Sequence, residues 1–142
     1  PRGRGAGAGA PGGEAVRVVL VRHGESTWNA EGRIQGSSDL SELTDKGHAQ
    51  AQTSSAALAS SAFDALYVSP LRRARQTAAH IWPLAAGGRP DPAAPGDALQ
   101  GAGGAVVTLD SLREIDLYAF QGLLKAEGEE RYGTQYNKWK NE

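Results

Sequence analysis

The feature that most constrains the fold of this chain is a short apolar run that ends at an arginine, a histidine and a glycine. Residues 16–21 read Val-Arg-Val-Val-Leu-Val, and Arg22, His23 and Gly24 follow directly. Such a run is typical of a strand buried on both faces, as in a parallel sheet covered by helices. Ligands of these sheets bind at the carboxyl ends of the strands. The pattern therefore predicts that Arg22 and His23 lie at a ligand site; the alternative is a polar pair that merely ends a strand at the surface.

Composition and charge exclude several classes of protein. The chain has 142 residues, a net charge of -1 and no cysteine. The length suits one domain, and the nearly balanced charge argues against nucleic acid as a partner. Without cysteine there is no disulfide framework, thiolate zinc site or cysteine-based phosphatase. No apolar run has transmembrane length and no signal-peptide core is present, so we expect a soluble chain with no membrane partner.

The first fifteen residues differ from the rest of the chain. Residues 1–15 are mainly Gly, Ala and Arg with one acidic side chain, which predicts a disordered tail. A transit peptide, a GC-rich coding bias and a flexible linker explain this tail equally well. The chain also lacks methionine throughout, which indicates a fragment, a processed form or a partial gene model. We therefore assign the folded domain to residues 16–142.

A helix is predicted after a polar stretch that follows His23. Thr44 is a good N-cap, and Asp45 places a carboxylate in the first turn, where it suits the helix dipole. Small side chains would let this helix pack closely. Its expected packing face consists of Ala49, Thr53, Ala56, Ala57 and Leu58.

Further elements follow along the chain. Residues 63–69 predict a strand, with a helix starting at Pro70, and residues 105–109 predict another strand. Between them, ten of the twenty-two residues of 83–104 are Gly or Pro, which predicts a flexible insertion. Residues 123–140 predict one or two helices broken near Gly133, with aromatic residues that pack.

Three arginines crowd the start of the helix after Pro70. Arg72, Arg73 and Arg75 would each be repelled there by roughly 0.3 to 1 kcal/mol, because the helix dipole is positive at this end. A bound anion reverses that sign, since free N–H groups and guanidinium groups both favour phosphate. The cluster therefore favours a phosphate site over a solvated face.

Three stretches together resemble the histidine phosphatase superfamily, also called the phosphoglycerate mutase-like family. They are RHGESTWN at 22–29, SPLRRARQTA at 69–78 and LRE at 112–114. The resemblance implies an α/β fold with three α/β/α layers and a mostly parallel sheet. It also assigns roles to individual residues, with neither metal nor cofactor. The implied catalytic residues are His23 as nucleophile and Glu114 as proton donor, and the implied phosphate ligands are Arg22, Asn29 and Arg73.

Without that resemblance, Glu114 is an exposed carboxylate paired with a neighbouring cation. Arg72 and Arg75 are expected to be peripheral.

Two further stretches resemble a plant branch of the family that acts on 2-carboxyarabinitol 1-phosphate. They are GRIQGSSDLSELT at 32–44 and LREIDLYAFQGLLK at 112–125. This likeness implies hydrolysis of a small phosphorylated metabolite, a sugar phosphate, through a phosphohistidine intermediate. It implies a chloroplast stroma location, the cytoplasm being the alternative. A mutase that transfers the phosphoryl group uses the same intermediate and is the nearest rival.

The family also places a second histidine after a late strand, beside the nucleophile. His48 and His80 lie within predicted helices and do not match that position. The resemblance therefore implies a C-terminally truncated domain that is weakly active or inactive as given. A non-catalytic fragment that binds a phosphorylated ligand is the alternative from another class.

Overall fold

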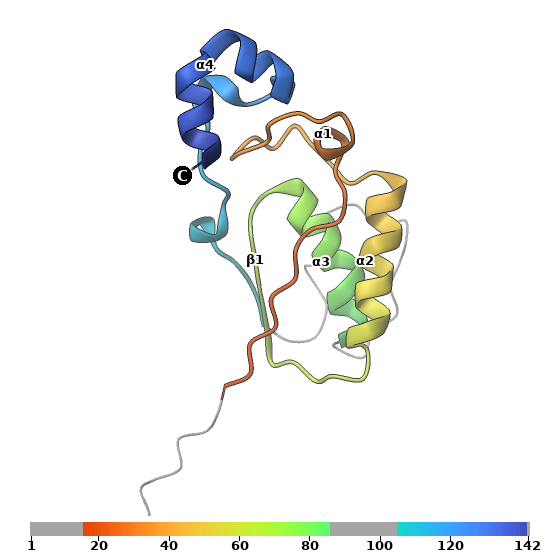
Figure 1. The fold of residues 1–142 in the computed structure, drawn as a ribbon. Coiled ribbons are helices and arrows are strands. Elements are labelled where there is room, and N and C mark those ends of the chain that lie inside the picture. Colours follow the sequence, from red (N-terminus) through yellow and green to blue (C-terminus); the bar gives the residue numbers. More distant parts are fainter. Residues whose placement is uncertain (1–15, 86–104, 142) are drawn as a thin grey trace, which may run out of the picture.

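The structure, a computed structural model, describes residues 16–85 and 105–141. The predicted tail at 1–15 and most of the predicted insertion lie outside these residues. The elements in chain order are α1 (Thr27–Ala30), α2 (Asp45–Leu58), β1 (Ala65–Val68), α3 (Arg72–Ala85), β2 (Ala105–Thr108), 3-10 turns at Asp110–Leu112 and Tyr118–Phe120, and α4 (Lys125–Asn141). Figure 1 shows α3 beside β1 and α2 beside α3. Helices combined with parallel strands confirm the predicted α/β class.

The two strands form a parallel pair that supports α3. Ala65 lies opposite Ala105 and Val68 opposite Thr108, so both predicted strands are confirmed. Val68 packs with Ala78 and Trp82 of α3 in the hydrophobic core. The buried Trp82 lies just before residues 83–85, which form the last turn of α3 and not the start of the predicted insertion. Because α3 is anchored on the sheet, its first turn is held at the carboxyl end of β1.

Helix α2 confirms the predicted cap but packs through a different face. The Thr44 side chain accepts a hydrogen bond from the Gly47 N–H at 3.1 Å, as an N-cap residue should. The buried residues are Gly47, Ala51 and Ser55, whereas the predicted packing residues are mostly exposed. The predicted face was wrong because the small residues of α2 lie where other backbones come close: Gly47 packs against residue 25, and Ser55 meets α3. The Ser55 hydroxyl donates to the His80 carbonyl at 2.6 Å across that contact.

The apolar run at 16–21 is extended but is not a strand, so this prediction was wrong. Val16 and Leu20 are 86% and 92% exposed, and the run forms no ladder with β1 or β2. β-Branched side chains favour an extended backbone, but a strand also needs a partner edge within hydrogen-bonding distance. A cavity lined by both segments lies between residues 19–23 and β1, so the two backbones do not pair.

Helix α4 confirms the predicted break. Gly133 has φ 42° and ψ -106°, values that L side chains rarely adopt, and the helix kinks there. The kink folds both halves of α4 around Phe120. The Phe120 ring lies 4.9 Å from the Tyr132 ring and 5.9 Å from the Trp139 ring, between centroids. The predicted packing role of these aromatic residues is therefore confirmed.

Candidate active site

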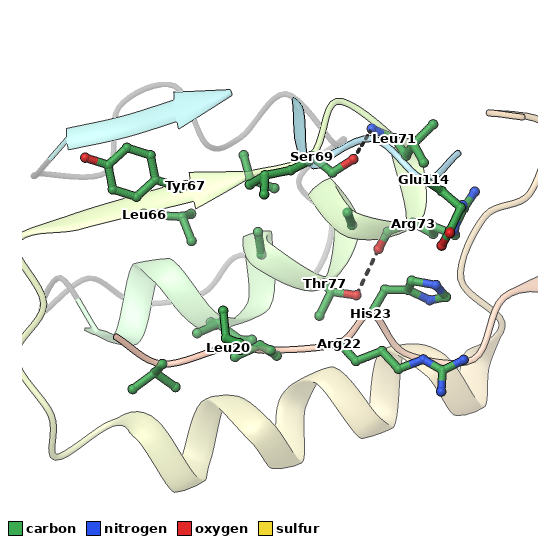
Figure 2. A pocket seen from close by; sticks show the side chains of 17 residues that line it. Leu20, Arg22, His23, Leu66, Tyr67, Ser69, Leu71, Arg73, Thr77 and Glu114 are labelled. Atoms are coloured by element: carbon green, nitrogen blue, oxygen red, sulfur yellow. Dashed lines mark hydrogen bonds between the residues drawn. The ribbon is translucent and has the colours of Figure 1, made fainter. Parts of the chain in front are cut away.

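Four of the predicted site residues line one cavity of about 340 Å³. The cavity is bounded by residues 19–23, β1 and the first turns of α3, and Figure 2 shows that its two ends differ. Polar side chains gather at one end: Arg22, His23, Arg73 and Glu114. Apolar side chains line the other end: Leu20, Leu66 and Tyr67. The fold thus brings together positions that are far apart in the sequence.

The His23 ring is held in one tautomer. Its Nδ1 atom lies 2.7 Å from the Gly24 carbonyl oxygen. Because a carbonyl oxygen can only accept a hydrogen bond, the ring hydrogen is on Nδ1. The neutral ring therefore keeps a lone pair on Nε2, which is the atom available to act as a nucleophile.

The charge state of His23 suits the same role. Burial lowers the pKa of His23 below its usual 6.5, the hydrogen bond to Gly24 raises it, Arg73 and Arg22 lower it, and Glu114 raises it. The net direction is downward, so the ring is neutral at pH 7.

Backbone packing holds the segment that carries His23 against α2. A β-carbon at Gly24 would lie 2.3 Å from the Gly47 carbonyl oxygen, a distance that real side chains essentially never show. Beside this contact, the Thr44 N–H donates to the Glu25 carbonyl at 3.0 Å. Gly24 is therefore required by a close approach of two backbones, and the first turn of α2 fixes the position of its neighbour His23.

Arg73 is buried and held in place by backbone carbonyls. It is 2% exposed, and its Nη1 and Nη2 atoms donate to the Ser38 and Gly36 carbonyls, each at 2.9 Å. Its Nε atom is buried without a hydrogen-bond partner. Burial lowers the pKa of Arg73, while the charges of Glu114 and Asp39 raise it. The chain thus holds a guanidinium group rigidly in the wall of the cavity.

Glu114 reaches the cavity because β1 and β2 are parallel. The carboxyl ends of parallel strands lie at the same edge of a sheet. The start of α3, which comes after β1, and Glu114, which comes after β2, therefore lie close together at that edge. The negative charge of Glu114 acts on both His23 and Arg73. Glu114 and Arg22 are both exposed, so either side chain can meet a ligand that enters from solvent.

The other two arginines of the cluster do not line the cavity. Helix α3 begins at Arg72, two residues after the predicted start, and the Arg72 N–H donates to the Asp39 carboxylate. The Arg72 side chain pairs with Glu42 at 3.2 Å on the surface. At the start of α3, the Asp39 carboxylate therefore occupies part of the place that was predicted for a bound anion. Of the three arginines, only Arg73 lines the cavity.

Asn29 lies outside the lining of the cavity. Its side-chain oxygen accepts hydrogen bonds from the Ser26 N–H at 3.3 Å and the Ser26 hydroxyl at 2.9 Å. The first of these bonds forms the capping box of α1 together with the Asn29 N–H, which donates to the Ser26 hydroxyl at 3.3 Å. Its role as a phosphate ligand stays a prediction.

Sequence reasoning missed two groups that position the site. One is the pair of carbonyls at Gly36 and Ser38, which lie in the stretch 32–44 singled out only for its family likeness. The other is Thr77, whose hydroxyl accepts a hydrogen bond from the Gly24 N–H at 3.1 Å. Its position one turn after Arg73 is the only signal in the sequence that could have indicated it.

The two remaining histidines contact each other. His48 Nδ1 and His80 Nε2 lie 2.9 Å apart between α2 and α3, and neither lines the cavity. Across residues 16–85 and 105–141, no group of three or more His, Cys, Asp or Glu side chains could hold a metal ion. Within the same ranges, no helix has both the length and the apolarity needed to cross a bilayer.

Comparisons with known proteins agree with this geometry. Residues 18–86 match the model of the histidine phosphatase superfamily, branch 1. A 2-carboxy-D-arabinitol-1-phosphatase of Triticum aestivum is 52% identical over 126 residues, which are 89% of this chain and 22% of that protein. Phosphoserine phosphatase 1 of Hydrogenobacter thermophilus is 33% identical over 89% of this chain and 52% of its own length.

The fold of this chain is also similar to that of proteins with solved structures. YhfR of Bacillus stearothermophilus superposes with a TM-score of 0.65 at 30% identity, over 83% of this chain and 50% of that one. The chain thus spans about a fifth of the wheat protein and about half of the two bacterial proteins. The family match over residues 18–86, the relatives and the fold agree, and each places the matched part of this chain beside the histidine phosphatase superfamily.

Proposed function

We propose that this chain supplies the nucleophile, the phosphate-binding arginines and the proton donor of a phosphomonoester hydrolase. The observation that carries the proposal is the neutral His23 ring, whose free Nε2 lies in the same cavity end as Arg22, Arg73 and Glu114. A nucleophile, two cations and an acid at one place are the groups that phosphoryl transfer from an ester needs.

The reaction runs in two steps. His23 Nε2 attacks phosphorus, a P–N bond forms and the bond from phosphorus to the ester oxygen breaks, while Glu114 in its protonated form gives that proton to the leaving alkoxide and becomes the carboxylate. Water then attacks phosphorus, the P–N bond breaks, and the Glu114 carboxylate takes a proton from that water. Arg22 and Arg73 stabilise the charge on the non-bridging oxygens in both steps. Asn29 adds a neutral hydrogen bond to the phosphate once it turns away from Ser26.

The substrate we propose is a small sugar phosphate, 2-carboxyarabinitol 1-phosphate. The support is the name of the wheat relative and its 52% identity over most of this chain. With that substrate, the proposed location is the chloroplast stroma.

A second candidate is phosphate-ester binding without turnover. The observation in its favour is that His23 is the single histidine in the lining of the cavity, so no second histidine is there to bind the phosphate. His48 and His80 contact each other between α2 and α3 instead. This candidate predicts that inorganic phosphate stabilises the protein but that no phosphohistidine forms.

The deciding experiment is to incubate the protein with a radiolabelled phosphate monoester and to look for acid-labile label. We expect label on the wild-type protein and on His48→Ala, and none on His23→Ala. Label that persists in His23→Ala refutes the proposed nucleophile. Stabilisation by inorganic phosphate without any label supports the second candidate instead.

A further inference from the structure

Thr77 links the histidine and the arginine of the site through one buried hydroxyl. Thr77 is 4% exposed and lies one turn after Arg73 in α3. Its hydroxyl donates to the Arg73 carbonyl at 2.9 Å and accepts from the Gly24 N–H at 3.1 Å. A hydroxyl has a single hydrogen, so the bond to Arg73 directs an oxygen lone pair toward Gly24. Figure 2 shows Thr77 beside the stretch that carries His23 and the bond between Thr77 and Arg73.

The next bond in the series reaches the reacting ring. The Gly24 carbonyl accepts the hydrogen bond from His23 Nδ1 at 2.7 Å. A fixed Gly24 therefore holds the hydrogen on Nδ1 and leaves the lone pair on Nε2. We propose that Thr77 is a positioning residue, which keeps His23 in the attacking tautomer by accepting the Gly24 N–H. This inference rests on the proposed function, because it matters for the reaction only if His23 is the nucleophile.

The geometry on the other side of Gly24 makes this bond decisive. Gly24 is pressed against Gly47 of α2, where even a β-carbon would lie 2.3 Å from a carbonyl oxygen. The segment can therefore relax only away from α2, toward the cavity and Thr77. Removal of the hydroxyl leaves the Gly24 N–H buried without a partner, and the segment moves to find one. That movement carries the Gly24 carbonyl away from Nδ1.

A second buried hydroxyl, which lies between α2 and α3, serves as the matched control. Ser55 is 2% exposed and donates to the His80 carbonyl at 2.6 Å, between α2 and α3. Ser55 has no bond to the segment that carries His23. Ser55→Ala should therefore lower stability, as Thr77→Val does, without changing the His23 ring.

The test uses the whole chain and two readouts. The first is the tautomer of the His23 ring, read from its ring nitrogen chemical shifts at neutral pH. We expect hydrogen on Nδ1 in the wild type, in Thr77→Ser and in Ser55→Ala, and a shift toward hydrogen on Nε2 in Thr77→Val. The second readout is the rate at which radiolabelled para-nitrophenyl phosphate labels His23. Thr77→Val should slow it by about 10- to 100-fold, and Thr77→Ser should restore it.

The outcomes separate this inference from the proposed function. An unchanged tautomer in Thr77→Val, or an equal change in Ser55→Ala, overturns the inference even if His23 is labelled normally. A changed tautomer in Thr77→Val without label on the wild type supports the positioning role and refutes the phosphatase. If Thr77→Val does not fold, hydrogen exchange of the wild-type Gly24 amide decides. Protection supports the bond to Thr77, and fast exchange overturns it.

Discussion

Replacement of Arg73 by methionine tests how the site is built. Methionine keeps most of the side-chain volume but removes the guanidinium group and its hydrogen bonds. The side chain is 2% exposed, and its two donors hold the Gly36 and Ser38 carbonyls. The variant should therefore release the stretch around residues 36–38 from the start of α3.

The expected loss follows from those two bonds. A hydrogen bond from a charged donor contributes about 1.5 to 3 kcal/mol, so two contribute about 3 to 6 kcal/mol. Part of this is offset, because burial already disfavours the charged form of Arg73 and an apolar side chain is more easily buried. We therefore expect the free energy of unfolding to fall by about 3 kcal/mol, near the lower end of that range.

Urea unfolding followed by tryptophan fluorescence measures this loss, because Trp82 is buried in the same helix. Arg72→Met is the matched control, since it makes the same chemical change at the next residue. The side chains of Arg72 and Glu42 are 57% and 50% exposed, so their ion pair should contribute only about 0 to 1 kcal/mol. Equal losses in the two variants would refute the argument that buried bonds from Arg73 hold the wall of the cavity.

Three further predictions test other parts of the molecule. Gly24→Ala should lower the free energy of unfolding by about 1 to 3 kcal/mol, because its β-carbon meets the Gly47 carbonyl; no loss in urea unfolding would contradict that contact. Burial and the charge of His48 lower the pKa of His80 below 6.5. The contribution of His80 to the free energy of unfolding should therefore be complete above pH 6.5 and should be lost as the pH falls below that value. The measurement is the melting temperature as a function of pH in the wild type and in the double variant His48→Gln and His80→Gln. The same pH dependence in both proteins would exclude this histidine pair as the cause. Gly133→Ala should cost about 1 to 3 kcal/mol because φ is 42° there, and an unchanged unfolding curve would show that the kink is not strained.

Local signals in the sequence predicted several elements correctly. Thr44 capped its helix, Gly133 broke another, and both strands after residue 60 formed where β-favouring runs occur. Each of these signals depends on residues within a few positions of one another, so it is legible without the fold. The family resemblance added Arg73, which the charge argument alone could not separate from Arg72 and Arg75.

The sequence by itself determined where the three longer helices and the two paired strands lie and which residue types the site can use, because caps, periodicity and motifs are local properties of the chain. Only the tertiary structure decided which face of α2 is buried, that the run at 16–21 has no strand partner in the described residues, and that one hydroxyl at Thr77 joins Gly24 to α3. The physical reason is that burial, partner edges and hydrogen-bond acceptors are supplied by residues far along the chain. No local pattern encodes the distance between those residues and the segment they hold.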